Sequence, residues 1–322
     1  MRIIVYGAGA IGCTLGFYIM RQGIEVILIG RPKIVEMSRQ SRLQIVTPSG
    51  TETLQLPIVE HPEDVNIRSG DIIFLCVKSQ DTDKAVQDIF KISSELPIFC
   101  FQNGIRNEQI AGKYFKNVYG VMVLVAATNM NGKRVVIERD PPGWLIMGCY
   151  PYGTDEVVET VAEILRKASL SVMVTPDIMP YKWGKLMLNL SNVIDAITNT
   201  KDNEINSRIA EMARTEMKEI LNTAGKHWIS LEELKVTWPD IRIVPKARRK
   251  VDLPNSTWQS LVSRRDNIET DYINGEIVSV AKQLGLKAPI NESLLNIART
   301  MAKNGEIPGK YSPDELFQLI NT

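Results

Sequence analysis

The sequence predicts an α/β domain with a doubly wound sheet, followed by an all-α C-terminal domain. In the first half of the chain, apolar strand-like runs are separated by single helical segments, a pattern typical of an open twisted sheet with helices on both faces. From about residue 178 to the end, apolar residues recur at helical spacing and almost no strand-like run is found. The change falls at the proline-containing turn near Thr175–Pro180. We therefore expect one domain at residues 1–176 and a second at residues 177–322.

The first element is a strand that runs into a glycine-rich turn. Residues 3–6 are apolar and mostly β-branched, "GAGAIG" follows with G-x-G-x-x-G spacing, and a helix runs to a stop at Gln22-Gly23 before a second strand at 26–29. The first glycine permits a tight turn, the second lets a pyrophosphate approach the helix N-terminus, and the third lets the helix pack close to the sheet. The alternative is a glycine turn without a ligand. The full strand–turn–helix–strand context instead predicts a Rossmann-type dinucleotide site, formed by Gly7, Ala8, Gly9, Ala10, Ile11 and Gly12.

The end of the second strand indicates which dinucleotide binds. An NAD site usually carries an acidic residue there, which accepts hydrogen bonds from the adenosine ribose. This sequence has "LIGRPK" instead, with Arg31 where the acid would be and Lys33 nearby. A guanidinium can hold a 2′-phosphate that a carboxylate would repel. The two cations could also be ordinary solvated loop charges, but the pattern favours NADP, used as NADPH.

The remaining elements of the first domain follow in order. Residues 43–59 alternate around Pro-Ser-Gly and predict a small hairpin insertion. Strands are expected at 71–78 and 96–104, with a helix at 81–92 that Asp81 opens. Further short strands are expected in "VYGVMVLVAATNM", "RVVIERD" and "GWLIMGC", and a helix at 154–170.

Composition excludes several classes of function. With 38 basic and 37 acidic residues, the chain has a formal net charge of +1, which gives no reason to expect nucleic-acid binding. The basic run at 245–250 lacks interleaved aromatic residues and is expected to be an exposed loop. No apolar run is long enough for a membrane span, and the chain begins with the first strand, so we expect a cytoplasmic protein without a signal peptide. The scattered cysteines predict buried thiols rather than a metal site or disulfides: Cys13, Cys76, Cys100 and Cys149.

Polar residues at the strand ends and along one helix are candidates for chemistry. Lys78 and Asn103 each lie at the carboxyl end of a predicted strand, at the sheet edge where ligands bind in such folds, although a lysine there is often solvated and Asn-Gly is often only a turn. Residues 180–198 are expected to form one helix, on which Lys185, Asn189 and Asn192 lie within about 60° of one another. This stripe is typical of a helix that lines a polar cleft. The alternative is an amphipathic surface helix.

A second polar segment, residues 255–277, is less informative from its residues alone. Ser256 would be a helix N-cap and Glu269 a surface acid. The chain has two histidines, His61 and His227, and neither is placed like a catalytic proton donor. If the protein reduces a carbonyl group, the acid should therefore be a lysine.

Six segments together resemble the ketopantoate reductase family, which reduces 2-dehydropantoate to pantoate with NADPH in pantothenate biosynthesis: "GAGAIG", "VKSQDTDKAV", "QNGIRNE", "KWGKLMLN", "STWQSL" and "ETDYINGEI". The resemblance runs the length of the chain. It implies a Rossmann domain, a helical domain for substrate binding and dimerisation, and an active site in the cleft between them. It also implies a small 2-oxoacid substrate, and we expect a homodimer without a metal.

The resemblance also assigns roles to residues of this chain. Lys185 matches the general acid and Glu269 the carboxylate that contacts the substrate hydroxyl. The other matches are Asn189 (substrate), Asn103 (nicotinamide and substrate), Lys78 (cofactor) and Arg31 (2′-phosphate).

Two positions depart from the family pattern. Val193 stands where the family has a second asparagine, with Asn192 one residue earlier, and the family's serine corresponds to Ser256 or Thr257. Reduction of another 2-oxoacid or an imine is therefore an alternative. A non-catalytic NADP-binding sensor is another, but it would predict the loss of Lys185 or Glu269, and both are present.

Overall fold

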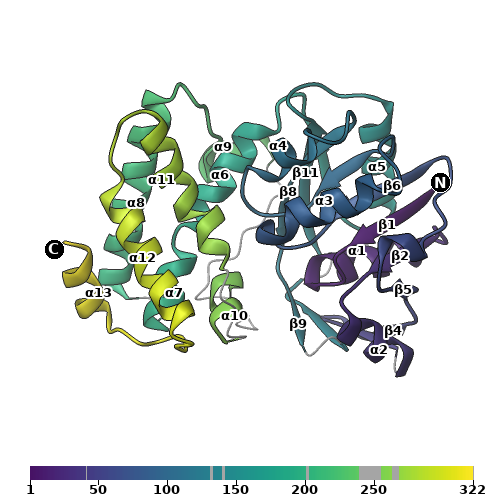
Figure 1. Cartoon of the computed structure of the whole chain (residues 1–322), viewed down its shortest axis with the longest axis horizontal. Helices are drawn as coiled ribbons and strands as arrows, with labels where there is room; N and C mark the ends of the chain where they lie inside the picture. The colour runs from purple at the N-terminus through teal and green to yellow at the C-terminus, as the bar shows by residue number, and fades with distance from the viewer. Residues whose placement is uncertain are drawn as a thin grey trace. The chain divides into compact units, whose positions relative to one another are not determined.

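The computed structural model describes residues 1–40, 42–130, 133–139, 142–200, 203–238, 255–262 and 268–321. The chain divides into two compact units, drawn as ribbons in Figure 1. The first unit contains Met1–Gln102 and Arg106–Met179. The second contains Asn103–Ile105 and the described residues from Pro180 onward. A mixed sheet builds the first unit and helices build the second, which confirms the predicted fold class.

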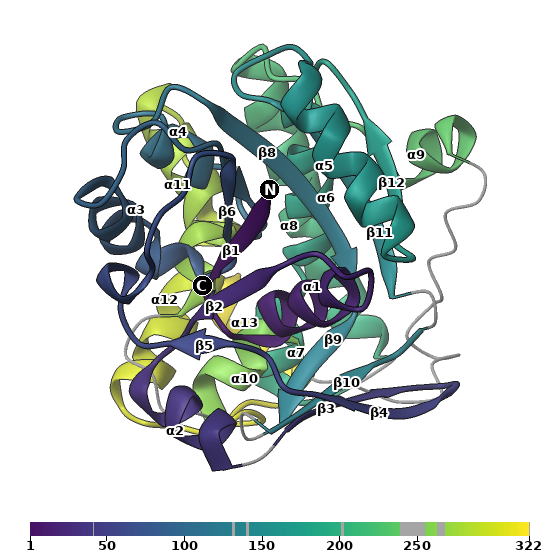
Figure 2. The ribbon, with the colours of Figure 1, turned by 90° about the vertical axis from the view of Figure 1, so that its right-hand side faces the viewer.

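The first unit is built on a sheet that has eight strands in the described residues, in the order β12-β11-β8-β7-β6-β1-β2-β5. From β5 to β8 neighbouring strands are parallel, whereas β11 pairs antiparallel with β8 and parallel with β12. Figure 2 shows the twist of this sheet. The strands are β1 (Arg2–Tyr6), β2 (Val26–Ile29), β5 (Ile58–Val59), β6 (Asp71–Leu75), β7 (Ile98–Cys100), β8 (Val118–Val125), β11 (Gly143–Cys149) and β12 (Ser171–Val174).

Helices cover both faces of this sheet because successive strand residues point to opposite sides. Ile3 and Val5 of β1 join the apolar core shared with α1 (Ala10–Met20) and α5 (Glu156–Lys167). Ile4, between them, joins the core shared with α3 (Thr82–Phe90). The doubly wound prediction is therefore confirmed.

Asp81 stands at the N-cap of α3, as predicted, but its side chain makes no capping hydrogen bond. The short η2 (Ser79–Asp81) precedes α3, and η1 (Pro62–Asp64) lies earlier in the chain.

Two helices and a second sheet in this unit were not expected from the sequence. The helices are α2 (Pro32–Gln40) and α4 (Asn107–Ala111). The predicted hairpin is confirmed as β3 (Leu43–Thr47) and β4 (Gly50–Leu54), but the segment after it leaves the hairpin and forms β5. In the described residues the second sheet has four strands, in the order β4-β3-β10-β9, because β3 pairs with β10 (Arg134–Ile137), which pairs with β9 (Ala127–Met130). Figure 2 shows these strands together near α1.

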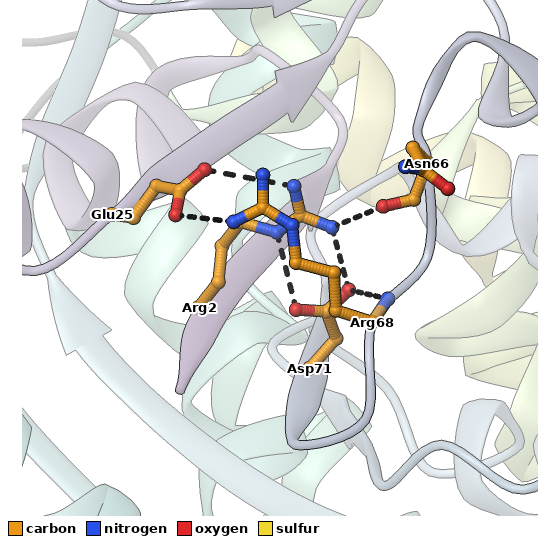
Figure 3. A network of polar contacts seen from close by, with 5 residues as sticks. All are labelled: Arg2, Glu25, Asn66, Arg68 and Asp71. Atoms are coloured by element: carbon orange, nitrogen blue, oxygen red, sulfur yellow. Dashed lines mark hydrogen bonds and ion pairs between the residues drawn. The ribbon is translucent and has the colours of Figure 1, made fainter.

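A buried ion-pair network fixes the amino ends of β1 and β6 (Figure 3). Arg2 donates from Nε and Nη2 to the two carboxylate oxygens of Asp71, at 3.1 and 2.6 Å. Arg2 also donates to the Asn66 carbonyl, and the backbone N–H of Arg68 donates to Asp71 at 2.8 Å. The hydrogen bonds to Asp71 raise the pKa of Arg2. This network holds the register of two central strands at the end opposite the glycine turn.

From Pro180 onward, the regular secondary structure of the described residues in the second unit is all helical, as predicted from residue 178 onward. Its core contains Trp183, Leu190, Ile209, Ile277 and Leu294, all nearly fully buried. The elements are α6 (Met179–Asn189), α7 (Asn192–Thr198), α8 (Glu204–Thr223), α9 (Leu231–Thr237), α10 (Ser256–Val262), η4 (Glu269–Tyr272), α11 (Asn274–Gln283), α12 (Pro289–Lys303) and α13 (Pro313–Ile320).

The prediction of one helix over residues 180–198 is wrong. Helix α6 ends at Asn189 and α7 begins at Asn192, with Leu190 and Ser191 in a turn between them. Asparagine and serine have low helix propensity, and the Ser191 hydroxyl donates back to the Leu188 carbonyl at 3.5 Å. The basic run at 245–250 lies outside the described residues.

Candidate functional site

The glycine turn after β1 contains three glycines, and the structure explains each of them differently. Gly7 has φ +118°, and a Cβ there would lie 2.6 Å from the backbone of Cys76 and Val77. A Cβ on Gly12 would lie 2.1 Å from the Gly7 carbonyl oxygen and 2.9 Å from Val5, which confirms the close helix–strand packing. The fold of the chain itself therefore requires glycine at both positions.

Gly9 is different because the described chain does not require a glycine there. Its backbone is extended, with φ −89° and ψ −163°, and no described heavy atom lies within 4 Å of the place where a Cβ would be. Gly9 is exposed at the N-cap of α1, followed by half-buried Ala10 and Ile11, whereas Ala8 is buried. The first turn of α1 has no acidic side chain. Open space at a positive helix N-terminus fits the approach of a pyrophosphate.

Arg31 lies next to this turn. The Gly7 N–H donates to the Ile29 carbonyl at 2.9 Å, and a Cβ on Gly30 would lie 2.9 Å from the Cβ of Ala8. The Arg31 carbonyl accepts from the N–H groups at the start of α2, so Arg31 occupies the N-cap of this helix. Lys33 is in the first turn, which has no acidic residue, and both cations are exposed. The two cations therefore stand at the positive end of α2. Our sequence interpretation missed this helix, although proline at its first position indicates a helix start.

Lys78 lies at the same sheet edge. The Cys76 N–H donates to the Tyr6 carbonyl at 2.7 Å, which places the segment after β6 against the glycine turn. Lys78 is half-buried, and its carbonyl accepts from the Asp81 N–H at 2.8 Å. The predicted strand therefore ends earlier, at Leu75, but Lys78 does lie beyond its carboxyl end, and the cofactor role of Lys78 stays a prediction.

Asn103 follows β7, before Gly104 with φ +82°, and is half-buried in the second unit. The residue before it, Gln102, belongs to a buried polar cluster that our sequence interpretation missed. Gln102 donates to the Thr82 hydroxyl at 2.9 Å, and Thr82 donates to Asn107 at 2.8 Å. All three side chains are at most 5% exposed. This cluster fixes the backbone that leads into Asn103.

In the second unit, α6 carries the predicted lysine. Lys185 and Asn189 are one turn apart and share a face of α6, as predicted; Lys185 is half-buried and Asn189 is 7% exposed. A Cβ on Gly184 would lie 1.9 Å from the Ile229 carbonyl oxygen, so this helix packs directly on backbone. Lys182, only 3% exposed, lies about 20° from Asn189 around the helix and was missed by our sequence interpretation.

Asn192 is not on this stripe, because the helix breaks before it. Its backbone carbonyl instead accepts from Asn255 Nδ2 at 3.1 Å, and Asn255 Oδ1 accepts from the Trp258 N–H at 2.9 Å. Asn255 is therefore the N-cap of α10, and the interpretation of Ser256 as the cap is wrong. The contact brings Asn192 and Ser256 to neighbouring helix starts. Thr257 is 1% exposed, and its hydroxyl has no hydrogen-bond partner among the described residues, whereas Ser256 is half-buried.

Glu269 is the second buried candidate. As the first residue of η4 it is 5% exposed, so the interpretation as a surface acid is wrong. Its Oε2 is buried and has no hydrogen-bond partner among the described residues. Burying a carboxylate oxygen without a donor is costly, so a donor from water, a ligand or residues outside the described ranges would stabilise this atom.

The described residues contain no group of three or more His, Cys, Asp or Glu side chains that could ligate a metal ion, and the four cysteines are free thiols. Cys13 and Cys100 are buried, as predicted, whereas Cys76 and Cys149 are only half-buried. Burial raises the pKa of Cys13 to about 12 and that of Cys149, with Asp155 nearby, to about 11. Within the same residues, no helix has the length and apolar character needed to cross a bilayer.

These features define a class of protein: an α/β domain with a glycine turn of the dinucleotide-binding type, followed by a helical domain. Residues 3–152 match the ketopantoate reductase PanE/ApbA family, and residues 177–302 match the C-terminal domain of the same family. The chain belongs to this family.

Named relatives support this assignment. The 2-dehydropantoate 2-reductase of Pyrococcus horikoshii is 32% identical over 299 residues, which cover 90% of this chain and 94% of the relative. That of Archaeoglobus fulgidus is 28% identical over 306 residues, covering 92% and 97%. Among solved structures, the PanE/ApbA family ketopantoate reductase from Ralstonia eutropha has a TM-score of 0.78 at 24% identity, covering 95% of this chain and 99% of that one.

The fold is shared with a second activity. D-mandelate dehydrogenase, solved with NADH and anilino(oxo)acetate, has a TM-score of 0.81 at 21% identity, covering 95% of this chain and 99% of that one. Family membership therefore leaves the substrate of this chain to be argued from its own residues.

Proposed function

We propose that this chain is a cytoplasmic 2-dehydropantoate 2-reductase that uses NADPH, with residues 1–176 as the cofactor domain and residues 177–322 as the domain for substrate binding and dimerisation. The observation that carries the substrate assignment is Glu269, whose buried Oε2 has no donor among the described residues. A substrate hydroxyl would supply that donor. Ketopantoate has such a hydroxyl, whereas a 2-oxoacid with a purely hydrocarbon side chain has none.

The cofactor proposal rests on Gly9 and Arg31. The open space at Gly9 fits a pyrophosphate, and the cations at the start of α2 fit a 2′-phosphate that NADH lacks. In this assignment Gly7, Ala8, Gly9, Ala10, Ile11 and Gly12 hold the pyrophosphate, Arg31 the 2′-phosphate, and Lys78 and Asn103 the rest of the cofactor. NADPH supplies the hydride that reduces the 2-keto carbon.

The residues of the second unit then handle the proton and the substrate. As the keto carbon is reduced, negative charge develops on its oxygen, and the Lys185 ammonium stabilises this charge and donates a proton to it. Asn189, together with Asn103, holds the oxoacid by neutral hydrogen bonds. Asn192 and one hydroxyl, Ser256 or Thr257, complete substrate binding. The buried hydroxyl of Thr257, which has no hydrogen-bond partner in the described part of the chain, favours Thr257 for this role.

Reduction of an aryl 2-oxoacid is the second candidate, because the fold matches D-mandelate dehydrogenase and the family's second asparagine is displaced to Asn192. The experiment is NADPH oxidation by the purified chain with three substrates: ketopantoate, its deoxy analogue 3,3-dimethyl-2-oxobutanoate, and phenylglyoxylate. We expect the highest kcat/KM with ketopantoate. A preference for phenylglyoxylate would replace the proposal with the second candidate.

We also propose a homodimer, since a structure of the Staphylococcus aureus ketopantoate reductase, with a TM-score of 0.73 at 19% identity over 95% of this chain and all of that one, is described as dimeric. Sedimentation of the purified chain tests this proposal, and a monomer at micromolar concentration would contradict it.

A further inference from the structure

The 3₁₀ turn that carries Glu269 is joined to helix α12 at two points. Asp271 in the turn accepts a hydrogen bond from Arg299 Nε at 2.6 Å. Asn274, the first residue of α11, donates from Nδ2 to Asn291 Oδ1 at 3.0 Å. The first contact is exposed, but the side chains of the second are 1% and 0% exposed. Helix α12 thus holds the turn by one surface contact and the start of α11, two residues after the turn, by one buried contact.

Asn291 is itself held by helix α8. Its Nδ2 donates to Glu216 Oε2 at 2.7 Å and to the Ala213 carbonyl at 3.1 Å. The Glu216 carboxylate also accepts the backbone N–H groups of Ile290 and Asn291, each at 2.9 Å. Since two acceptors face the amide nitrogen of Asn291, its amide oxygen must face Asn274. Helices α8, α11 and α12, which pack on one another, are therefore linked through a single buried amide (Figure 1).

Two backbone hydrogen bonds at the ends of the turn are long: the Asp271 N–H donates to the Ile268 carbonyl at 3.3 Å, and the Ile273 N–H donates to the Thr270 carbonyl at 3.2 Å. Ile268 and Ile273 are also buried in the core of the unit, so packing helps to hold both ends of the turn. Such 3₁₀ geometry is less favourable than that of an α-helix. Ile273, with φ −116° and ψ −83°, leaves helical geometry before α11 begins. Glu269 Oε2 makes no hydrogen bond within the described chain, so the position of the carboxylate depends on how this backbone is held.

We propose that Asn274, fixed by Asn291 and Glu216, is a positioning residue for Glu269. Its amide holds the end of the 3₁₀ turn against α12, so that the carboxylate is pre-organised before substrate binds. The effect on substrate choice rests on the proposed function, in which Glu269 accepts the substrate hydroxyl.

The test is Asn274→Ala in the full chain, because alanine is a good residue for the first turn of α11. Asn206→Ala is the matched control: Asn206 is a buried amide in the same unit and donates to the Thr198 hydroxyl at 2.9 Å and the Thr200 carbonyl at 3.2 Å. The readout is the ratio of kcat/KM for ketopantoate to that for 3,3-dimethyl-2-oxobutanoate. We expect this ratio to fall roughly three- to tenfold in Asn274→Ala, as for the loss of about one hydrogen bond, and to stay within about twofold in the control.

A double variant separates positioning from stability. Combining Asn274→Ala with Glu269→Gln should lower the ratio no further than Glu269→Gln alone, because both changes remove the same interaction. Equal losses on both substrates in Asn274→Ala, or effects that multiply in the double variant, would overturn the proposal.

A second readout does not depend on the reaction. If the wild-type chain reduces neither substrate, the proposed function fails, and amide hydrogen exchange over Thr270–Ile273 decides the positioning role. Exchange should be faster in Asn274→Ala than in Asn206→Ala, and equal rates would overturn it. If Asn274→Ala does not fold, Asn274→Asp replaces it, because aspartate keeps the size of the side chain but has no N–H to donate to Asn291. An unchanged ratio in a folded Asn274→Asp protein would reject the role.

Discussion

Replacing Lys185 by methionine tests the proposed acid with little disturbance of the helix that carries it. Methionine keeps most of the apolar volume of the side chain and removes its charge and its proton. Helix α6 is anchored by other residues, since Gly184 packs on the Ile229 backbone and Leu186 is buried in the core of the unit. The half-buried side chain of Lys185 is not part of that core. We therefore expect folding to change little.

The magnitude follows from the role of the residue. Loss of a general acid typically lowers the rate by ~10²–10⁴, which corresponds to a barrier higher by roughly 3–5 kcal/mol, and loss of electrostatic stabilisation adds to this. The Kd for NADPH should change by less than about twofold, well under 1.4 kcal/mol, because the pyrophosphate and 2′-phosphate residues proposed here all belong to the first unit.

The assay combines turnover of ketopantoate with the Kd for NADPH and the melting temperature. Lys226→Met is the control, because Lys226 is an exposed cation of the same unit, 5.8 Å from the Trp183 ring, with no assigned role. The control should keep wild-type turnover. A Lys185→Met protein that folds, binds NADPH and turns over near the wild-type rate would refute the role of Lys185 and make Lys78 the next candidate.

Four further substitutions test the site and the fold. Arg31→Ala should weaken NADPH binding about 10- to 100-fold, as for loss of a charge-assisted hydrogen bond, and NADH binding hardly at all; NADH that binds wild type as tightly as NADPH would contradict the assignment. Glu269→Gln should lower kcat/KM at least about fivefold more for ketopantoate than for its deoxy analogue, and equal losses would show that Glu269 does not contact the hydroxyl. Gly9→Ala, at a site with open space, should leave the melting temperature unchanged or raise it, yet weaken NADPH binding in a fluorescence titration; unchanged affinity would separate this glycine from the cofactor. Asp71→Asn leaves buried Arg2 without its carboxylate and should lower the free energy of unfolding by about 3 kcal/mol in a urea titration, whereas a loss as small as that of Arg21→Ala, which breaks the exposed pair with Glu52, would show that the network does not stabilise the strands.

The sequence predicted the structure best where the local pattern of apolar residues directly reflects their burial in the fold. The first strand, the glycine turn, helix α1 and β2 were all predicted, with β2 at the same residues. Both faces of the sheet are buried, so its strands are continuous apolar runs that cannot be mistaken for surface loops. The change to an all-helical second unit was visible for a similar reason, because helical periodicity persists over many turns.

The sequence predictions were wrong where a local pattern is compatible with two structures, and only contacts with distant residues decide between them. The pairing of β3 with β10 joins residues about ninety positions apart, and no local signal specifies it. The break after Asn189 depends on a serine that bonds back to Leu188, and the cap of α10 is Asn255 because this side chain also reaches the carbonyl of Asn192. Burial of Glu269 was also invisible, since three neighbouring polar residues in "ETDY" are typical of a surface turn.

Gly9 in the first unit and Glu269 in the second raise the same question: why does the chain keep a residue that does not stabilise the fold? A glycine in extended backbone with open space around it gives the folded protein no packing, and it costs conformational entropy relative to alanine. A buried carboxylate oxygen without a donor in the described chain costs solvation energy and returns nothing to the fold. Stability alone would favour alanine at the first position and an apolar residue at the second. Both residues are explained if a ligand completes their surroundings, with a phosphate close to the backbone at Gly9 and a hydrogen-bond donor at Glu269. This argument from cost requires neither the motif nor the family, and it asks only for a hydrogen-bond donor at Glu269 and a group that fits the open space at Gly9. The dinucleotide phosphate and the substrate hydroxyl of the proposed function meet these two requirements.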